Sequence, residues 1–142
     1  MFVGQYAHQL DTKNRLRFPA KFKAELGSRA FVMKGTDGCL FVLSENEYQK
    51  IAEKIASVPL FSKTQAAVRQ FLSSGIEVEE DNQGRFLLKP HLREFASITK
   101  NVVFVGVGSR VEIWSEERWN AKYNVGAEDY DEVIAELGEL GI

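Results

Sequence analysis

Two short stretches of this sequence share one spacing of an acid and an arginine. "DTKNR" runs from Asp11 to Arg15, and "DNQGR" runs from Asp81 to Arg85, an offset of 70 residues. A single Asp-x-x-x-Arg is common by chance, but a motif that returns in a matched context indicates an internal repeat. Such a repeat constrains the fold more than any other feature, because each copy must adopt the same local structure.

The residues around the two motifs also follow the same order. Past each motif the offset becomes 71, so that Pro19 aligns with Pro90. At the same offset "LFVLSENEYQ" aligns with "VEIWSEERWN", which pairs Tyr48 with Trp119. We therefore read two copies of one unit of about 45 residues. The copies are expected near residues 4–49 and 75–120.

Each copy has clear signals for turns and strands. The motif is a polar turn between two short extended arms, and Asn14 and Gly84 occupy the position that suits a left-handed backbone. The prolines can each start a short helix at its first position. Two apolar arms then flank Asp37-Gly38, which predicts a hairpin.

Helices are expected elsewhere. "SENE", from Ser44, fits a capping box, and the residues behind it have helical periodicity. A second helix is predicted over residues 62–73, and the acidic tail "EDYDEVIAELGEL" is amphipathic. The tail's apolar stripe can pack on its own domain or against a neighbouring subunit.

One copy alone is too small to bury an adequate core. Two copies in one chain can bury their apolar faces against each other. The predicted fold class is therefore α+β, mainly β, with interleaved hairpins in a pseudo-twofold module and peripheral helices.

Charge is unevenly distributed along the chain. The formal net charge is -2, but residues 1–35 contain seven Lys or Arg and two acids, whereas residues 111–142 contain two Lys or Arg and nine acids. The basic N-terminal third favours an anionic partner. No run of about 18 apolar residues is present, so a membrane span is not expected, nor is a secretory signal. Cys39 is the only cysteine and is predicted to be a small core residue, which agrees with a reducing cytoplasm.

The twin motifs suit DNA recognition. An arginine can bind guanine or phosphate through two hydrogen bonds, and an Asp four residues earlier can hold its guanidinium in one pose. Nearby cations would bind phosphates without reading sequence. The candidate DNA-binding residues are Asp11, Lys13, Arg15, Arg17, Lys21, Asp81 and Arg85, with Lys23 as a further phosphate contact. The alternative is that each Asp and Arg form only a surface ion pair.

These residues carry a family resemblance. "GQYAHQLDTKNRLRFPAKFKAELG", "EEDNQGRFLLKPHLREF" and "VEIWSEERWN" resemble segments of the MraZ family of bacterial transcriptional regulators. The resemblance covers residues 1–120 and implies two SpoVT/AbrB-like swapped-hairpin units forming a β-barrel module. It also implies a cytoplasmic, nucleoid-associated homo-oligomeric ring. Such a ring would bind double-stranded DNA at promoter repeats of the division and cell-wall gene cluster and repress it.

The repeat and the helical patterns predict a domain organisation in which the resemblance identifies the two units as SpoVT/AbrB-like. The first unit is expected at 4–49, a helical connector at 50–74, the second unit at 75–120 and an acidic C-terminal helix at 121–142. Asn14 stands where the family usually has Gly. Glu77, Glu79 and Glu80 precede the second motif and are expected to repel phosphate, which makes the first copy the better candidate for DNA contact.

Other functions find less support in the residues. His8 and His91 have no partner at metal-ligand spacing, and no nucleotide-binding or nucleophile motif appears. No Asp or Glu has an apolar setting that would mark a general acid. We expect no enzyme, no cofactor, no metal and no small-molecule substrate. The main alternative is a protein-interaction or antitoxin-like module on the same fold, with residues 126–142 binding a partner.

Overall fold

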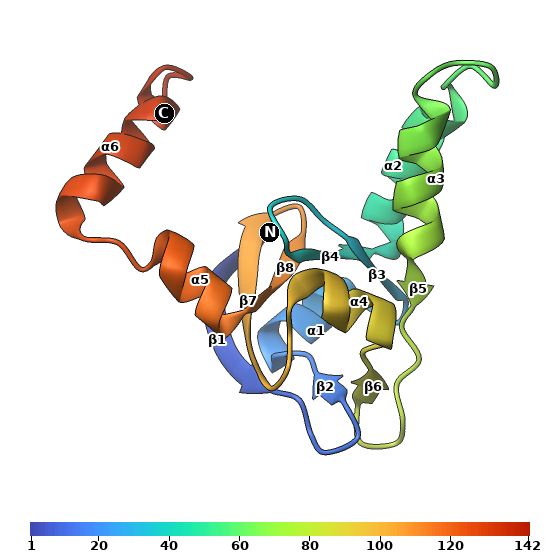
Figure 1. The fold of residues 1–142 in the computed structure, drawn as a ribbon, viewed down its shortest axis with the longest axis horizontal. Helices are drawn as coiled ribbons and strands as arrows, with labels where there is room; N and C mark the ends of the chain where they lie inside the picture. Colours follow the sequence, from blue (N-terminus) through green and yellow to red (C-terminus); the bar gives the residue numbers. More distant parts are fainter.

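The chain folds into an α+β structure with one six-stranded sheet, one two-stranded ribbon and six helices, described for all of residues 1–142 in a computed structural model (Figure 1). The first copy contains β1 (Phe2–Gln9), β2 (Arg15–Arg17), α1 (Ala20–Leu26), β3 (Ala30–Lys34), β4 (Leu40–Ser44) and α2 (Glu45–Ala56). The helix α3 (Gln65–Ser74) follows it. The second copy contains β5 (Ile76–Glu77), β6 (Arg85–Leu87), α4 (Pro90–Ala96), β7 (Asn101–Gly108), β8 (Val111–Ser115) and α5 (Glu116–Tyr123), and α6 (Ala127–Gly138) ends the chain. The same order of elements thus occurs twice, as the repeat predicts.

Strands of the two copies pair with each other within the large sheet. The large sheet has the order β1-β7-β8-β4-β3-β5, and all of its neighbours are antiparallel. The first strand of each copy therefore pairs with the hairpin of the other copy, β1 with β7 and β5 with β3. The two hairpins meet along β4 and β8. These pairs leave β1 and β5 at the two ends of the sheet, so closure into a β-barrel stays a prediction.

The ribbon of β2 and β6 is the second contact between the copies. Leu16 lies opposite Phe86 at its centre, and both side chains are buried because alternate residues of a strand point to opposite faces. Phe18 stacks on Phe86 with ring centroids 4.6 Å apart. The main core cluster of 19 buried residues draws on both copies. In Figure 1 the ribbon and its two turns project below the large sheet.

The predicted local signals hold in the hairpin and helix ends. Asp37 and Gly38 form the turn between β3 and β4 with φ of 57° and 82°. The Ser44 hydroxyl accepts a hydrogen bond from the backbone N of Glu47 at 3.3 Å, which caps α2. Only half of the predicted capping box forms, and the Glu47 carboxylate pairs with Lys50 rather than with the backbone N of Ser44. Cys39 is buried, and burial raises the pKa of its thiol to about 12, so the thiol stays protonated at neutral pH.

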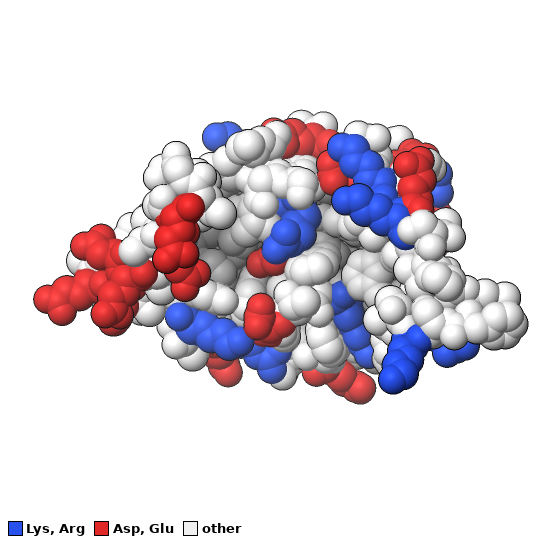
Figure 2. Space-filling model, turned by 90° about the horizontal axis from the view of Figure 1, so that it is seen from above, with Lys and Arg blue, Asp and Glu red and all other residues white.

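Two helical segments extend from the sheet. The helices α2 and α3 form an arm in Figure 1, and Phe61, in the segment that joins them, is 98% accessible. The helix α5 continues past the expected unit boundary at residue 120, and α6 follows after a short linker. No residue of α6 is buried, so its apolar stripe does not pack on its own domain. Figure 2, which views the face away from the ribbon, shows acidic side chains gathered at the end of the molecule where α6 lies. No helix combines the length and apolar character that crossing a membrane requires.

The ribbon supplies a paired test of its role in stability. Leu16→Ala removes a side chain that is 1% exposed between the two copies, and we expect a loss of about 3 kcal/mol in the free energy of unfolding. Leu87→Ala, on the partner strand, removes a side chain that is 47% exposed and should change that free energy by less than about 0.5 kcal/mol. Urea denaturation at one protein concentration measures both. Equal losses in the two variants would contradict this assignment of the buried face.

Candidate nucleic-acid interface

The first motif forms a turn that its own aspartate holds closed. Asp11 Oδ1 accepts hydrogen bonds from the backbone N of Lys13 and of Arg15, each at 2.9 Å. The backbone N of Asn14 donates to the carbonyl of Asp11 at 3.0 Å, and Asn14 has φ of 60°. Asn tolerates this left-handed conformation better than most residues, which explains its position in the motif.

The second motif repeats this geometry. Asp81 Oδ1 accepts from the backbone N of Gln83 and of Arg85, each at 2.9 Å. Gly84, with φ of 75°, takes the place of Asn14. The repeated Asp therefore has a definite local function, because a side-chain acceptor that binds backbone N–H groups two and four residues ahead fixes the turn.

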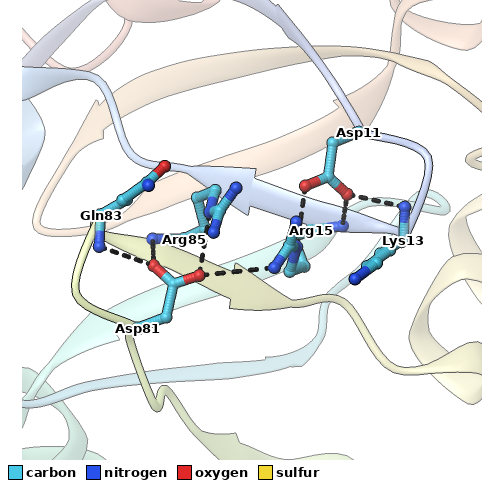
Figure 3. A network of polar contacts seen from close by, with 6 residues as sticks. All are labelled: Asp11, Lys13, Arg15, Asp81, Gln83 and Arg85. Atoms are coloured by element: carbon cyan, nitrogen blue, oxygen red, sulfur yellow. Dashed lines mark hydrogen bonds and ion pairs between the residues drawn. The ribbon is translucent and has the colours of Figure 1, made fainter.

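The second carboxylate oxygen of each aspartate holds the arginine of its motif. Arg15 Nε donates to Asp11 Oδ2 at 2.8 Å, and Arg85 Nε donates to Asp81 Oδ2 at 2.9 Å. Arg15 Nη1 also lies 3.6 Å from Asp81 Oδ2, which links the two copies. Figure 3 shows the four side chains between the two turns. The Nη groups at the end of each guanidinium are thus left for an outside acceptor, except for the long Arg15–Asp81 contact.

The two aspartates are held in the charged form. The backbone N–H of Arg15 is the largest cause that lowers the pKa of Asp11 below its usual 3.8, and the Arg15 side chain adds to the effect. The backbone N–H of Arg85 lowers the pKa of Asp81 in the same way. Both carboxylates therefore remain ionised, and both arginines remain held, throughout the physiological pH range.

The outer face of the ribbon gathers three arginines. Because Leu16 and Phe86 point inward, their neighbours on the two strands point outward. Arg15 and Arg85 lie at diagonally opposite corners of this face, and Arg17 and Leu87 lie at the other two. A hollow of about 250 Å³ beside the ribbon is lined by His8, Gln9, Asp11, Arg15, Leu16, Arg17 and Arg85. We call the four outward corners, Arg15, Arg17, Arg85 and Leu87, the ribbon face.

Positive charge on this surface is only partly compensated. Arg17 lies directly opposite Arg85, and like charges across an antiparallel pair are destabilising. Arg85 pairs with Asp81, but Arg17 forms no ion pair. Lys13, in the first turn, and Lys21, on α1, are exposed and also unpaired. Uncompensated cations on and beside one ribbon favour the binding of an anion.

Two expectations about individual charges change with the structure. Lys23, expected at a phosphate, pairs with Glu80 of the other copy and also donates to the carbonyl of Gly27. Glu77 pairs with Arg29, with its Oε1 2.6 Å from Arg29 Nε, and Arg29 lowers the pKa of Glu77. Two of the three acids expected to repel phosphate at the second motif are therefore compensated. The second copy is therefore better suited to anion binding than its sequence indicates.

The structure reveals two residues that sequence reasoning missed. Leu87 is exposed at a corner of the ribbon face, and only the strand register β2–β6 places it there. Glu112 is a buried carboxylate, contrary to the expectation that no acid has such a setting. It accepts hydrogen bonds from Trp114 Nε1 at 3.0 Å and Arg110 Nη2 at 2.8 Å. These partners satisfy its charge, which is a structural role rather than that of a general acid.

Neither histidine lies in a group that could bind a metal. No cluster of three or more His, Cys, Asp or Glu side chains has suitable geometry for a metal ion. His91 Nε2 lies 2.9 Å from the carbonyl oxygen of Ser74, and the His8 ring packs edge-on against Phe104.

The geometry of the first motif predicts that the pKa of Asp11 stays low even when the Arg15 side chain is removed. Arg15→Ala removes the guanidinium but keeps the backbone N–H that is the main cause of the lowered pKa. We expect Asp11 to titrate below 3.8 in both the wild type and Arg15→Ala, as measured by the carboxyl carbon shift in NMR. Any stabilisation from Asp11 is complete above pH 3.8 and is lost as the pH falls through the folded-state pKa. A return of the Asp11 pKa to its usual value in Arg15→Ala would contradict the assigned cause.

Comparison with known proteins places the chain in a family. The sequence model of the family described as "MraZ protein, putative antitoxin-like" matches residues 1–71 and again residues 71–132. A protein of Carboxydothermus hydrogenoformans is 46% identical over 96% of each chain. Proteins of Caldanaerobacter subterraneus subsp. tengcongensis and Clostridium acetobutylicum are 47% and 44% identical over the whole length of both chains. All three are named transcriptional regulator MraZ. The resemblance that the twin motifs carry is confirmed, and this chain belongs to the MraZ family.

Proposed function

We propose that this protein is a DNA-binding transcriptional regulator whose ribbon face contacts the double helix. The observation that carries the proposal is the pair of aspartate-held arginines on one two-stranded ribbon, together with Arg17, which has no counter-charge. A two-stranded β-ribbon fits the major groove of B-form DNA. The names of the relatives, transcriptional regulator MraZ, support the same function.

Sequence recognition falls to the held arginines. The Nε of Arg15 and of Arg85 is occupied by aspartate, so each guanidinium presents its Nη groups to the O6 and N7 acceptors of a guanine. An arginine that is already ordered loses less conformational entropy when it binds. The role of Asp11 and Asp81 is therefore to position the arginines.

Affinity comes from the unpaired cations. Lys13, Arg17 and Lys21 would contact phosphates, which fixes the orientation of the protein without reading bases. Each neutralised phosphate steepens the dependence of binding on salt by about one unit of the log–log slope. Lys23 is a weaker candidate because Glu80 already binds it.

A ring of copies would multiply this single small site. The apolar stripe of α6, formed by Tyr130, Val133, Ile134 and Leu137, is exposed and supports association with another copy. Repeated ribbon faces on one ring would bind tandem repeats with increased avidity. We therefore propose that the chain forms a ring on promoter repeats of the bacterial division and cell-wall gene cluster, in the nucleoid, and represses transcription.

The fold proposed for this function is a pair of swapped-hairpin, SpoVT/AbrB-like units at 4–49 and 75–120 that close into a pseudo-twofold barrel. The pairing of β1 with β7 and of β5 with β3 supports it, since each copy completes the hairpin of the other. The connector at 50–74 and the acidic helix at 121–142 lie outside these units.

A second candidate function is a protein-interaction or antitoxin-like module. The observation that favours it is the exposed apolar stripe of α6, which in this case binds a different protein rather than another copy. Deletion of residues 126–142 would then abolish capture of that protein and leave DNA binding unchanged.

DNA binding tests the first proposal directly. The purified protein is titrated into labelled DNA from upstream of its own gene, and into scrambled DNA, at two salt concentrations. Arg15→Ala should weaken binding to the upstream DNA about tenfold or more, because one guanine contact is lost. Arg69→Ala on α3 removes an exposed, unpaired arginine far from the ribbon and is the matched control. Equal affinity for both DNAs, or wild-type binding by Arg15→Ala, would show that the motifs are only ion pairs.

The α6 stripe predicts a change in oligomeric mass. The double variant Val133→Asp, Ile134→Asp places charge on the exposed stripe and should lower the mass measured by light scattering after size exclusion. Glu132→Ala, on the opposite side of the same helix, should leave the mass unchanged. If the double variant keeps the wild-type mass, α6 is not the contact between copies.

A further inference from the structure

We propose that Leu87 reads the C5 methyl group of a thymine and is a specificity-determining residue of the ribbon face. This inference rests on the proposed function, since it assumes that the ribbon face lies against DNA bases. The observation behind it is the position of an apolar side chain, 47% exposed, at one corner of a face whose other three corners are arginines.

The position of Leu87 follows from the repeat and the register. Under the offset of 70 residues Leu87 is the counterpart of Arg17, and in the ribbon it lies directly opposite Arg15. It is therefore as central to the face as the arginines, and a DNA groove that receives Arg15 also receives Leu87. Because its strand neighbour Phe86 points into the core, the alternation of side chains along β6 places Leu87 on the outer face.

The chemistry at this corner favours a base edge over a phosphate. A leucine offers no charge or donor for a phosphate oxygen. The hollow of about 340 Å³ beside Leu87 is also lined by Glu77, Glu79 and Lys89, and only Glu77 among these forms an ion pair. In that hollow the free carboxylate of Glu79 offsets the free ammonium of Lys89, so the charges beside Leu87 do not favour a phosphate. The thymine methyl is the one apolar group that the major groove exposes, and apolar side chains recognise it by contact.

This assignment makes the two halves of the ribbon chemically different. Arg15 and Arg85 exchange under the pseudo-twofold axis and can make equivalent contacts. Arg17 and Leu87 exchange under the same axis but cannot, because one is a cation and the other is apolar. A ribbon with this asymmetry reads its site in one direction, with a phosphate contact at one end and a thymine methyl at the other.

A double-mutant cycle between protein and DNA tests the proposal. The shortest upstream duplex that the wild type binds is prepared with each thymine replaced in turn by 2′-deoxyuridine, which removes the methyl group alone. We expect one replacement to weaken wild-type binding about fourfold, the value for losing one buried methyl-sized contact. Leu87→Ala should weaken binding to the unmodified duplex to a similar extent and should be insensitive to that same replacement.

Two further variants complete the experiment. Leu87→Arg makes the ribbon face symmetric and should abolish the response to the methyl while steepening the salt slope by about one unit. Leu60→Ala, at an exposed leucine beyond α2, should behave as the wild type. Size exclusion of each variant shows whether the oligomer is intact.

The outcomes separate this inference from the proposed function. If the wild type binds the duplex and Arg15→Ala does not, the proposed function stands. In that case the role of Leu87 is overturned if no deoxyuridine replacement weakens wild-type binding, or if Leu87→Ala loses as much affinity on replacement as the wild type does. A change in oligomeric mass in Leu87→Ala would also overturn it, by showing that Leu87 packs between copies. If the wild type binds no duplex, both fall together.

Discussion

The contact between the two copies through Leu16, Phe18 and Phe86 is the interaction on which the rest of the structure depends. These three side chains are buried beneath the ribbon, and Phe18 and Phe86 stack directly. Since each copy is too small to bury a core alone, the apolar face of one must be covered by the other. Burying these residues fixes which face of β2 and β6 points outward. The arginines therefore lie on the outer face of the ribbon as a consequence of how the core packs.

The aspartates convert this exposed ribbon into an ordered charged surface. One oxygen of each closes the turn through backbone N–H groups, and the other holds an arginine Nε. The same carboxylate thus sets both the backbone and the side-chain pose. Because the lowered pKa arises mainly from the backbone, the turn keeps its charge even when the arginine is engaged elsewhere. Arg15 or Arg85 can then exchange partners without releasing the turn.

The local structure could be predicted from the sequence, but the partners of several charged side chains could not. The turns at Asn14 and Gly84, the hairpin at Asp37-Gly38 and the cap at Ser44 follow from residue types that act within a few positions. The pairing of Lys23 with Glu80 joins residues 57 positions apart, and no local pattern indicates it. The hydrogen-bond partners of Glu112 lie only two residues away, but its burial was missed because its position opposite Phe41 comes from the pairing of β4 with β8. Contacts between residues far apart in the sequence decide which charges remain unpaired, and such contacts leave no local pattern in the sequence.

The sequence by itself determined that two similar units exist, where their turns and hairpins lie, and which residues carry the repeated acid–arginine chemistry. These features depend on backbone preferences and hydrogen bonds between near neighbours, which the residue types encode directly. Only the tertiary structure decided that β1 and β5 pair with the opposite copy, that Arg17 faces Arg85 and that Leu87 shares their surface. The physical reason is strand register: shifting a pairing by one residue turns every side chain to the other face, and the register is set by burying Leu16 against Phe86.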